Sequence, residues 1–335
     1  MEPTAVEWSR LYEAAAQFKK VKPWEWLSNV HLFGVSSPIK DETGYCCVMG
    51  NGGEMYGMAV YMGGPGLHTV LSMLNGDFAG DPLFAQHCYM LSFDNRDDLY
   101  PEEYKRVKEL GFSYRGKNAW PTFRLYEPGY VPWPLLSRDD VLFLTDAIEQ
   151  ALEVSLAYQN NPDALLEGNG ERFLVRVPKK VLSGWTSEWR SPEAKKPMLR
   201  EQETLMVDEL RMAKAKRTVK HSGGIWEVAS FFVPMPIQEE GRPFYPTMNL
   251  IADQETGMML HHGMTKQSEA AGDLAEGLLQ LIETHHVVPA LLVSTDEIVF
   301  GRLDNVIAGL GLEYRLVPEL PAIEEFQQAM SGHLF

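Results

Sequence analysis

The stretches IWEVASFFVPM (225–235), YPTMNLIA (245–252) and GMMLHHGMT (257–265) decide the fold of the second half of this chain. Each is an apolar run of strand length, and DQETG (253–257) separates the last two with turn-forming residues. We therefore expect three antiparallel strands that follow one another across a sheet.

Alternating helices and strands are predicted after these three strands. Apolar residues recur at helical spacing in 268–284, the apolar run 289–294 is a buried strand, and 300–310 is a helix that ends at a glycine. A strand over 312–317 and a helix over 323–330 follow. The predicted order is βββ-α-β-α-β-α, a mixed sheet in an α+β domain.

This order resembles the ribonuclease H-like fold of transposase and integrase cores, and PALLVSTD (289–296), a helix and LEYRLVP (312–318) are similar to the second half of such a core. The resemblance covers the second half of the chain. It implies carboxylates on the first strand, at the end of the fourth strand and on the last helix. Together they would hold two Mg²⁺ or Mn²⁺ ions for phosphodiester cleavage.

The sequence fills this implied set incompletely. Asp296 stands at the end of the fourth strand, and the last helix offers Glu324 or Glu325. The first strand offers only Glu227 near its start, and Asp253 lies in the turn after the wrong strand. A site without its central acid is not expected to hold two metals, so we expect no cofactor, with Mg²⁺ or Mn²⁺ as the alternative.

The charge balance also weighs against a nuclease. The chain has 30 Lys and Arg against 46 Asp and Glu, a net charge of −16, and from Arg200 onward 10 basic and 20 acidic residues give −10. Nucleic-acid-binding proteins instead neutralise phosphates with clustered cations. We identify one basic cluster and interpret it as a solvated helix face: Arg211, Lys214, Lys216, Arg217 and Lys220.

The first half predicts an N-terminal α+β domain with an antiparallel hairpin sheet. A helix over 5–20, a hairpin turn at 51–53 and a long helix capped by Ser137 are its clearest elements. We expect this domain to span 1–182, a linker and connecting helix to span 183–220, and the ribonuclease H-like domain to span 221–335.

Aromatic residues are dense in the first half, and they either form its core or line a binding groove. Six of the 16 methionines, from Met49 to Met90, add adaptable apolar surface to the same domain. The groove candidates are Trp24, Trp26, Tyr56, Tyr61, Trp120 and Trp133.

The whole chain also resembles a group of uncharacterised bacterial proteins with two tandem domains of unknown function. The segments that carry this resemblance are KPWEWL (22–27), GYCCVMGNGGEMYGMAVYMG (44–63) and FYPTMNLIADQETGMML (244–260). Because that group has no assigned activity, the resemblance implies a division into domains and carries no catalytic residues.

Other motifs give weak signals. Cys46, Cys47 and Cys88 are expected to be buried thiols, and in a strand only one of His261 and His262 can face a common site. The start MEPTAVEWSR has no signal-peptide pattern, so we expect a cytoplasmic protein without a membrane segment.

We therefore expect a non-catalytic binding or accessory protein that contacts a protein or peptide or associates with itself, with nucleic acid an unlikely partner. The alternatives are a metal-dependent phosphodiesterase and a small-molecule site between the domains.

Overall fold

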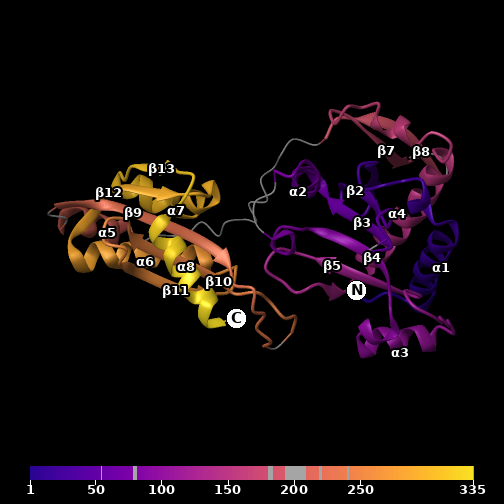
Figure 1. Ribbon diagram of the computed structural model, residues 1–335, viewed down its shortest axis with the longest axis horizontal. Helices are drawn as coiled ribbons and strands as arrows, with labels where there is room; N and C mark the ends of the chain where they lie inside the picture. The colour runs from indigo at the N-terminus through magenta and orange to yellow at the C-terminus, as the bar shows by residue number, and fades with distance from the viewer. Residues whose placement is uncertain are drawn as a thin grey trace. The chain divides into compact units, whose positions relative to one another are not determined.

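The structure is a computed structural model that describes residues 1–53, 55–77, 81–179, 184–192, 209–218, 221–239 and 241–334. The chain divides into two compact units, Met1–Met198 and Leu199–Phe335. Each unit has its own sheet and core, and each is described here by itself (Figure 1). No helix in the described ranges is long and apolar enough to cross a membrane.

The described strands of the first unit form one sheet in the order β6-β5-β4-β3-β2-β1-β7-β8. All neighbours are antiparallel except β1 and β7, which run parallel. The strands are β1 (Phe33–Ser37), β2 (Glu42–Met49), β3 (Gly57–Met62), β4 (Cys88–Asp94), β5 (Trp120–Tyr126), β6 (Trp133–Pro134), β7 (Phe173–Pro178) and β8 (Trp185–Arg190).

Helices cover both faces of this sheet. One face packs against α1 (Ala5–Val21) and α4 (Arg138–Ala157), and the other packs against α2 (Gly63–Asn75). Because side chains alternate along a strand, Cys46 lies in the first of these cores and Cys47 in the second. Burial raises the pKa of both thiols, that of Cys47 to about 12, and Cys88 is buried as well, as expected.

Several predicted elements of the first unit are confirmed. The helix over 5–20 is α1, which ends where Lys22 adopts a left-handed φ of 55° before Pro23. The turn at 51–53 joins β2 to β3, and the Ser137 hydroxyl caps α4 by accepting from the Asp140 N–H at 3.1 Å. The helix α3 (Pro101–Glu109) begins at its proline, which needs no N–H partner there.

The prediction of a linker from 183 onward was wrong for 185–190. Trp185–Arg190 is β8, which pairs with all six residues of β7. The strand itself, WTSEWR, contains no proline, and its partly exposed, polar residues suit an edge strand, where one side faces solvent. Ser183 and residues 193–208 lie outside the described ranges.

The second unit has a five-stranded sheet in the order β11-β10-β9-β12-β13. β9, β10 and β11 are antiparallel neighbours, whereas β12 runs parallel to both β9 and β13. This is the ribonuclease H-like strand order predicted from the sequence. The elements are α5 (Glu209–Thr218), β9 (His221–Phe232), β10 (Thr247–Asp253), β11 (Met259–Thr265), α6 (Ala270–His285), β12 (Val287–Ser294), α7 (Glu297–Leu310), β13 (Tyr314–Leu316) and α8 (Pro321–Leu334).

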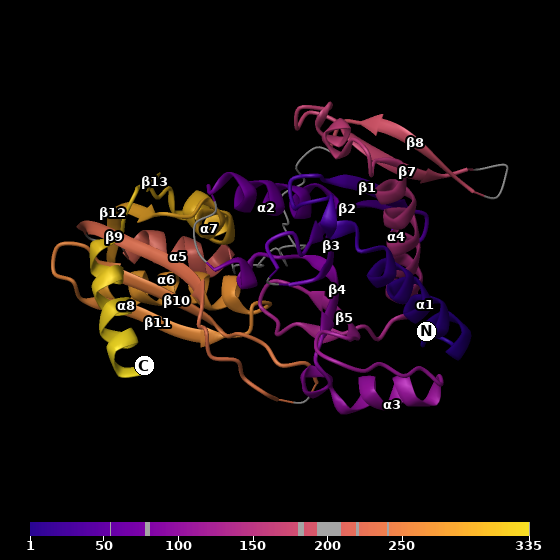
Figure 2. The ribbon, with the colours of Figure 1, turned by 45° about the vertical axis from the view of Figure 1, so that its right-hand side comes forward.

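This sheet is also covered on both faces. Helices α6 and α7 lie on one face and α8 lies on the other (Figure 2). Trp226 and Val228 of β9 belong to the core with α6 and α7, whereas Val233, Met248 and Leu250 belong to the core with α8. The strand predicted over 225–235 is β9, which begins earlier, at His221, and ends at Phe232. It ends before Pro234 because proline has no N–H to donate to a neighbouring strand.

Helix α5 was predicted to be part of the connection, but it packs on the second unit. Its Arg211 donates to both oxygens of Glu276 at 2.6 and 2.9 Å and of Glu283 at 2.8 to 3.1 Å, both on α6. Arg211 holds the pKa of Glu283 below its usual value. The predicted basic cluster is thus partly an internal clamp, and Lys220 lies outside the described ranges.

We predict that Arg211→Gln loosens α5. The two bidentate ion pairs are partly exposed, so the variant should lose about 1 kcal/mol of stability at neutral pH. The pKa of Glu283 is lowered in the folded state, so this contribution is present above the unfolded pKa and disappears as pH falls through the folded pKa. Hydrogen exchange of the α5 amides should accelerate at neutral pH and not in acid. Lys216→Gln, an exposed cation on the same helix, is the control; equal acceleration in both variants would contradict the clamp.

Candidate functional site

The carboxylates predicted as metal ligands serve as caps in the structure. The Asp296 Oδ1 accepts from the Ile298 N–H at 2.9 Å and caps α7. The Asp253 Oδ1 accepts from the N–H and the hydroxyl of Thr256, at 2.8 and 2.7 Å, and closes the β10–β11 turn. These acids hold local structure, as Asp commonly does at helix starts and turns.

Glu227 is the most unusual of these acids because its side chain is fully buried on the α8 face of the sheet. Its Oε2 accepts from the Ile323 N–H at 3.0 Å, in the first turn of α8, and its Oε1 has no hydrogen-bond partner among the residues that the structure describes. The Glu324 Oε1 accepts from the Leu320 N–H at 3.3 Å. Both acids therefore lie at the N-terminus of α8, where the helix dipole favours a negative charge.

Within the described ranges, no three His, Cys, Asp or Glu side chains come together in a way that could hold a metal ion. Glu227 and Glu324 meet at the start of α8, while Glu325 is exposed on the same helix. Asp253 closes a separate turn. Burial lowers the pKa of the Arg302 guanidinium, and the negative charge of Asp296 partly offsets that effect.

The histidine pair on β11 divides between the two faces, as predicted for a strand. His262 is exposed, whereas the His261 Nε2 lies 3.4 Å from Asp273 Oδ2 on α6. Two glycines make room for this pair. A Cβ on Gly263 would lie 2.1 Å from Asp273 Oδ2, and a Cβ on Gly277 would lie 2.5 Å from the His261 ring.

Asp273 continues into a row of polar contacts beneath α6 and α7. Arg302 donates to the Ser230 hydroxyl, which donates to Asn249 Oδ1 at 2.7 Å, and the Asn249 amide donates to Asp273 Oδ2 at 2.8 Å. Asn249 is fully buried. The row satisfies buried polar groups across two strands and joins two helices to the sheet, which is a structural role.

An apolar groove on the α8 side of the sheet is the strongest candidate for a binding site. Its volume is about 550 Å³, within the range of ligand pockets. We call it the methionine groove. The residues that line it are Val233, Met235, Pro236, Ile237, Pro246, Met248, Met264, Phe326, Ala329 and Met330.

Three parts of the second unit form the groove. The segment between β9 and β10 extends past the sheet as a narrow hairpin, held by the Val233 N–H to Pro246 carbonyl bond at 2.9 Å and by the bridge of Ile237 with Phe244. Met248 and Met264 come from neighbouring strands, and Phe326 and Met330 come from α8. The prolines within 234–246 were the sequence signal for this hairpin. The groove could not be predicted, because residues from distant segments line it.

Of the two alternatives for the aromatic residues of the first unit, core or groove, three of the six candidates belong to the core. Trp24, Trp120 and Tyr61 are buried, and they lie in the two cores on either side of the sheet. Trp26 and Tyr56 are partly buried and pack against the same core as Trp24. Trp133 packs against Tyr100, with ring centroids 5.2 Å apart. Their spacing reflects core packing rather than a shared surface.

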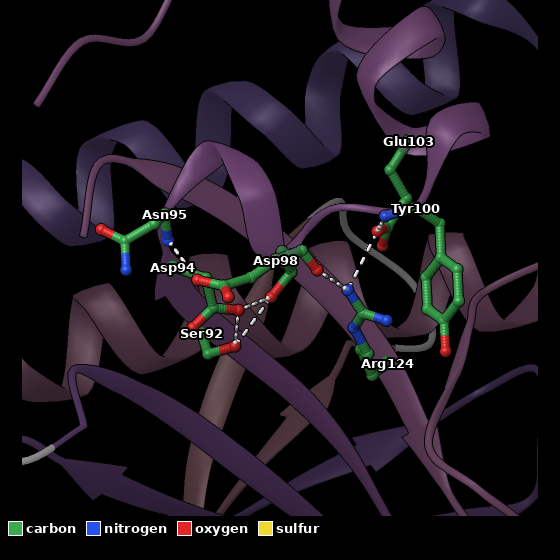
Figure 3. A network of polar contacts seen from close by, with 8 residues as sticks. Ser92, Asp94, Asn95, Asp98, Tyr100, Glu103 and Arg124 are labelled. Atoms are coloured by element: carbon green, nitrogen blue, oxygen red, sulfur yellow. Dashed lines mark hydrogen bonds and ion pairs between the residues drawn. The ribbon is translucent and has the colours of Figure 1, made fainter. Parts of the chain in front are cut away.

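A polar network lies at the end of β4 in the first unit (Figure 3). The Asp94 Oδ2 accepts from the Ser92 hydroxyl at 2.8 Å and the Thr122 hydroxyl at 2.5 Å. Arg124 of β5 donates to the Asp98 carbonyl at 3.1 Å and to Glu103 Oε2 at 3.0 Å. The network fastens the Asp94–Tyr100 loop and α3 to the sheet.

Glu103 and Arg124 form the most buried ion pair of this network, with side chains 6% and 13% exposed. Burial raises the pKa of Glu103, and the charge of Arg124 opposes that rise. A buried pair of this kind costs desolvation energy and depends on both partners.

The chain matches two family models. A model described as a domain of unknown function (DUF7309) matches residues 8–176. The chain belongs to that family. A second model, domain of unknown function (DUF6930), matches residues 211–331. One match falls in each unit, which confirms the expectation of two tandem domains of unknown function.

The chain is also similar to two solved integrase cores. The HTLV-2 integrase catalytic core domain in complex with magnesium is 10% identical, with a TM-score of 0.26 over 34% of this chain and 70% of that one. The catalytic core domain of BIV integrase is 18% identical, with a TM-score of 0.23 over 31% of this chain and 62% of that one. Scores this low say nothing about activity. No curated protein matches this chain.

We predict that Arg124→Met destabilises the first unit by about 3 kcal/mol at neutral pH, because it leaves the Glu103 carboxylate buried without its ion-pair partner. The pKa of Glu103 then rises further, so the loss should shrink as pH falls and the acid becomes neutral. Denaturant unfolding at several pH values measures this. The double variant Glu103→Leu with Arg124→Met should recover most of the stability lost in Arg124→Met. If it does not, Arg124 stabilises the unit through contacts other than its pair with Glu103.

For Glu227 we predict that the free energy of unfolding depends on its hydrogen bond to the Ile323 N–H and not on its negative charge. Glu227→Gln keeps an acceptor for the Ile323 N–H and should leave the free energy of unfolding unchanged or raised. Glu227→Ala leaves that N–H unpaired beside a cavity and should cost about 2 kcal/mol. Chemical denaturation of the three proteins compares them. Equal loss in the Gln and Ala variants would show that the carboxylate itself is required.

Proposed function

We propose that this protein is a non-catalytic binding protein whose second unit takes up apolar side chains of a protein partner in the methionine groove. The lining of that groove supports the proposal most directly. Each of the ten residues that form it is apolar, and four of them are methionines. Methionine side chains repack around different shapes, and they are common on surfaces that bind varied apolar segments.

Exposure of the rim favours binding over simple packing. Met235 and Met264 are 47% and 56% exposed, although both border the same apolar volume as the buried Val233 and Met248. Exposed apolar surface that continues into a buried floor is typical of an interaction site.

Charge favours a cationic amphipathic segment over an anionic lipid. The residues from Arg200 onward carry 10 basic and 20 acidic side chains, a net charge of −10. Beside the groove, Glu325 is exposed on α8, and Lys266 is paired with Glu239 at 2.7 Å. A peptide helix with leucines on one face and lysines on the other complements both the lining and this charge.

The roles of the acidic residues also favour this proposal over metal-dependent phosphodiester cleavage. Asp253 and Asp296 cap backbone N–H groups, as do Glu227 and Glu324. A small-molecule site between the units stays a separate hypothesis, which a ligand screen by thermal shift addresses.

We predict that a labelled amphipathic helical peptide, with leucines on one face and lysines on the other, binds the intact protein. Met264→Glu places a charge in the groove and should weaken binding about tenfold or more. Met258→Glu is the matched control, because Met258 is similarly exposed, at 60%, and does not line the groove. Fluorescence anisotropy measures the affinities, and thermal melts confirm that both variants fold.

Two results would contradict the proposal. Equal weakening by Met264→Glu and Met258→Glu would show that the peptide binds the charged surface and not the groove. Magnesium-dependent cleavage of DNA or RNA by the purified protein, abolished by Asp296→Asn, would establish the enzymatic alternative instead.

A further inference from the structure

Three segments of the first unit that are distant in sequence meet at Asn118. The Asn118 carbonyl accepts from Lys19 Nζ, at the end of α1, and its N–H donates to Asn95 Oδ1 at 3.2 Å, beside the 3₁₀ turn η3 (Arg96–Asp98). Asn118 itself has a left-handed φ of 50°, a conformation that Asn tolerates. The end of α1, η3 and the loop after α3 therefore share one surface.

Five cations lie on the three segments that meet at this junction, where Asp97 and Asp98 of η3 are also exposed. We call Lys19, Lys22, Arg96, Arg115 and Lys117 the basic patch. Four of them are exposed, and Lys19 is half-buried. The stretch KRVKELGFSYRGK (105–117) alone has five cations and one acid. This patch was not predicted from the sequence, because its five members come from three segments.

Lys19 forms no ion pair with a carboxylate of the described residues. Within the part of the chain that the structure describes, its Nζ contacts only the Asn118 carbonyl and the Phe93 ring, whose centroid is 5.0 Å away. Burial lowers the pKa of Lys19. A partly desolvated cation of this kind gains more from an approaching anion than a fully hydrated lysine does.

Helix-end electrostatics do not explain the whole patch. Cations in the last turn of a helix complement its dipole, which accounts for Lys19. Arg115 and Lys117 lie in the loop after α3, where no helix dipole acts. Lys22 is paired with Glu25 at 3.4 Å, but both side chains are more than half exposed, so that pair is weak.

The aromatic rings beside the basic patch already contact cations of the protein, which argues against nucleic acid as the ligand. Proteins that bind single strands stack bases on free aromatic rings. Here Arg96 lies over the Tyr104 ring at 4.7 Å, Lys108 approaches the same ring at 5.6 Å, and Lys19 covers Phe93.

We propose that the basic patch of the first unit binds an acidic segment of a protein partner, a run of Asp and Glu side chains that pairs with Lys19, Arg115 and Lys117. This site is separate from the methionine groove, and it would act on a different part of a partner or on a different partner. Its recognition is electrostatic, so affinity falls as salt rises.

Binding of a fluorescein-labelled oligo-glutamate peptide to the full chain tests the proposal at low ionic strength. Arg115→Glu with Lys117→Glu should weaken binding about tenfold or more, and the corresponding double Gln variant should weaken it less. Both positions are exposed in a loop, so both variants should keep the wild-type melting temperature. The control reverses two exposed cations of the other unit, Lys216→Glu with Arg217→Glu, and should change little.

Three results would overturn the proposal. They are an absence of peptide binding at low salt, equal weakening by the control pair, and tighter binding of a single-stranded oligonucleotide of matched charge. Met264→Glu should leave oligo-glutamate binding unchanged, so failure at the methionine groove and failure at the basic patch are distinguishable.

Discussion

Burial of both faces of each sheet is the constraint on which the rest of the structure depends. Side chains alternate along a strand, so a strand covered on both sides must find partners for every residue. Cys46 and Cys47 meet this demand as small apolar groups in two different cores. Glu227 meets it differently, because a carboxylate inside the second unit needs a donor and finds one in the first turn of α8.

In the described part of the second unit, the ribonuclease H-like order does not bring the predicted carboxylates together as a metal centre. In this chain the acids near the ends of β10 and β12 close a turn and start a helix, and Glu227 fastens α8. An acid that accepts from backbone N–H groups keeps its charge satisfied without a cation.

The two proposed binding surfaces lie where this coverage ends. The methionine groove opens between α8 and the hairpin over 233–246, where apolar residues continue past the packed core. The basic patch lies where α1 ends and two loops meet at Asn118. One surface offers apolar area and the other offers charge, so each selects a different chemistry in a partner.

The sequence by itself determined the order of helices and strands and the division into two parts. It also determined that α1 ends before Pro23 and that α4 begins at Ser137. These features follow from the hydrophobic period, from proline and from capping side chains, which act over a few residues. The sequence left the strand β8 and the docking of α5 undetermined, since both depend on pairing with distant elements. Only the tertiary structure decided that Trp24 and Trp120 are core, that four methionines share a groove, and that Lys19, Arg96 and Lys117 share a surface. Those facts are contacts between residues far apart in the chain, and such contacts leave no local pattern to read.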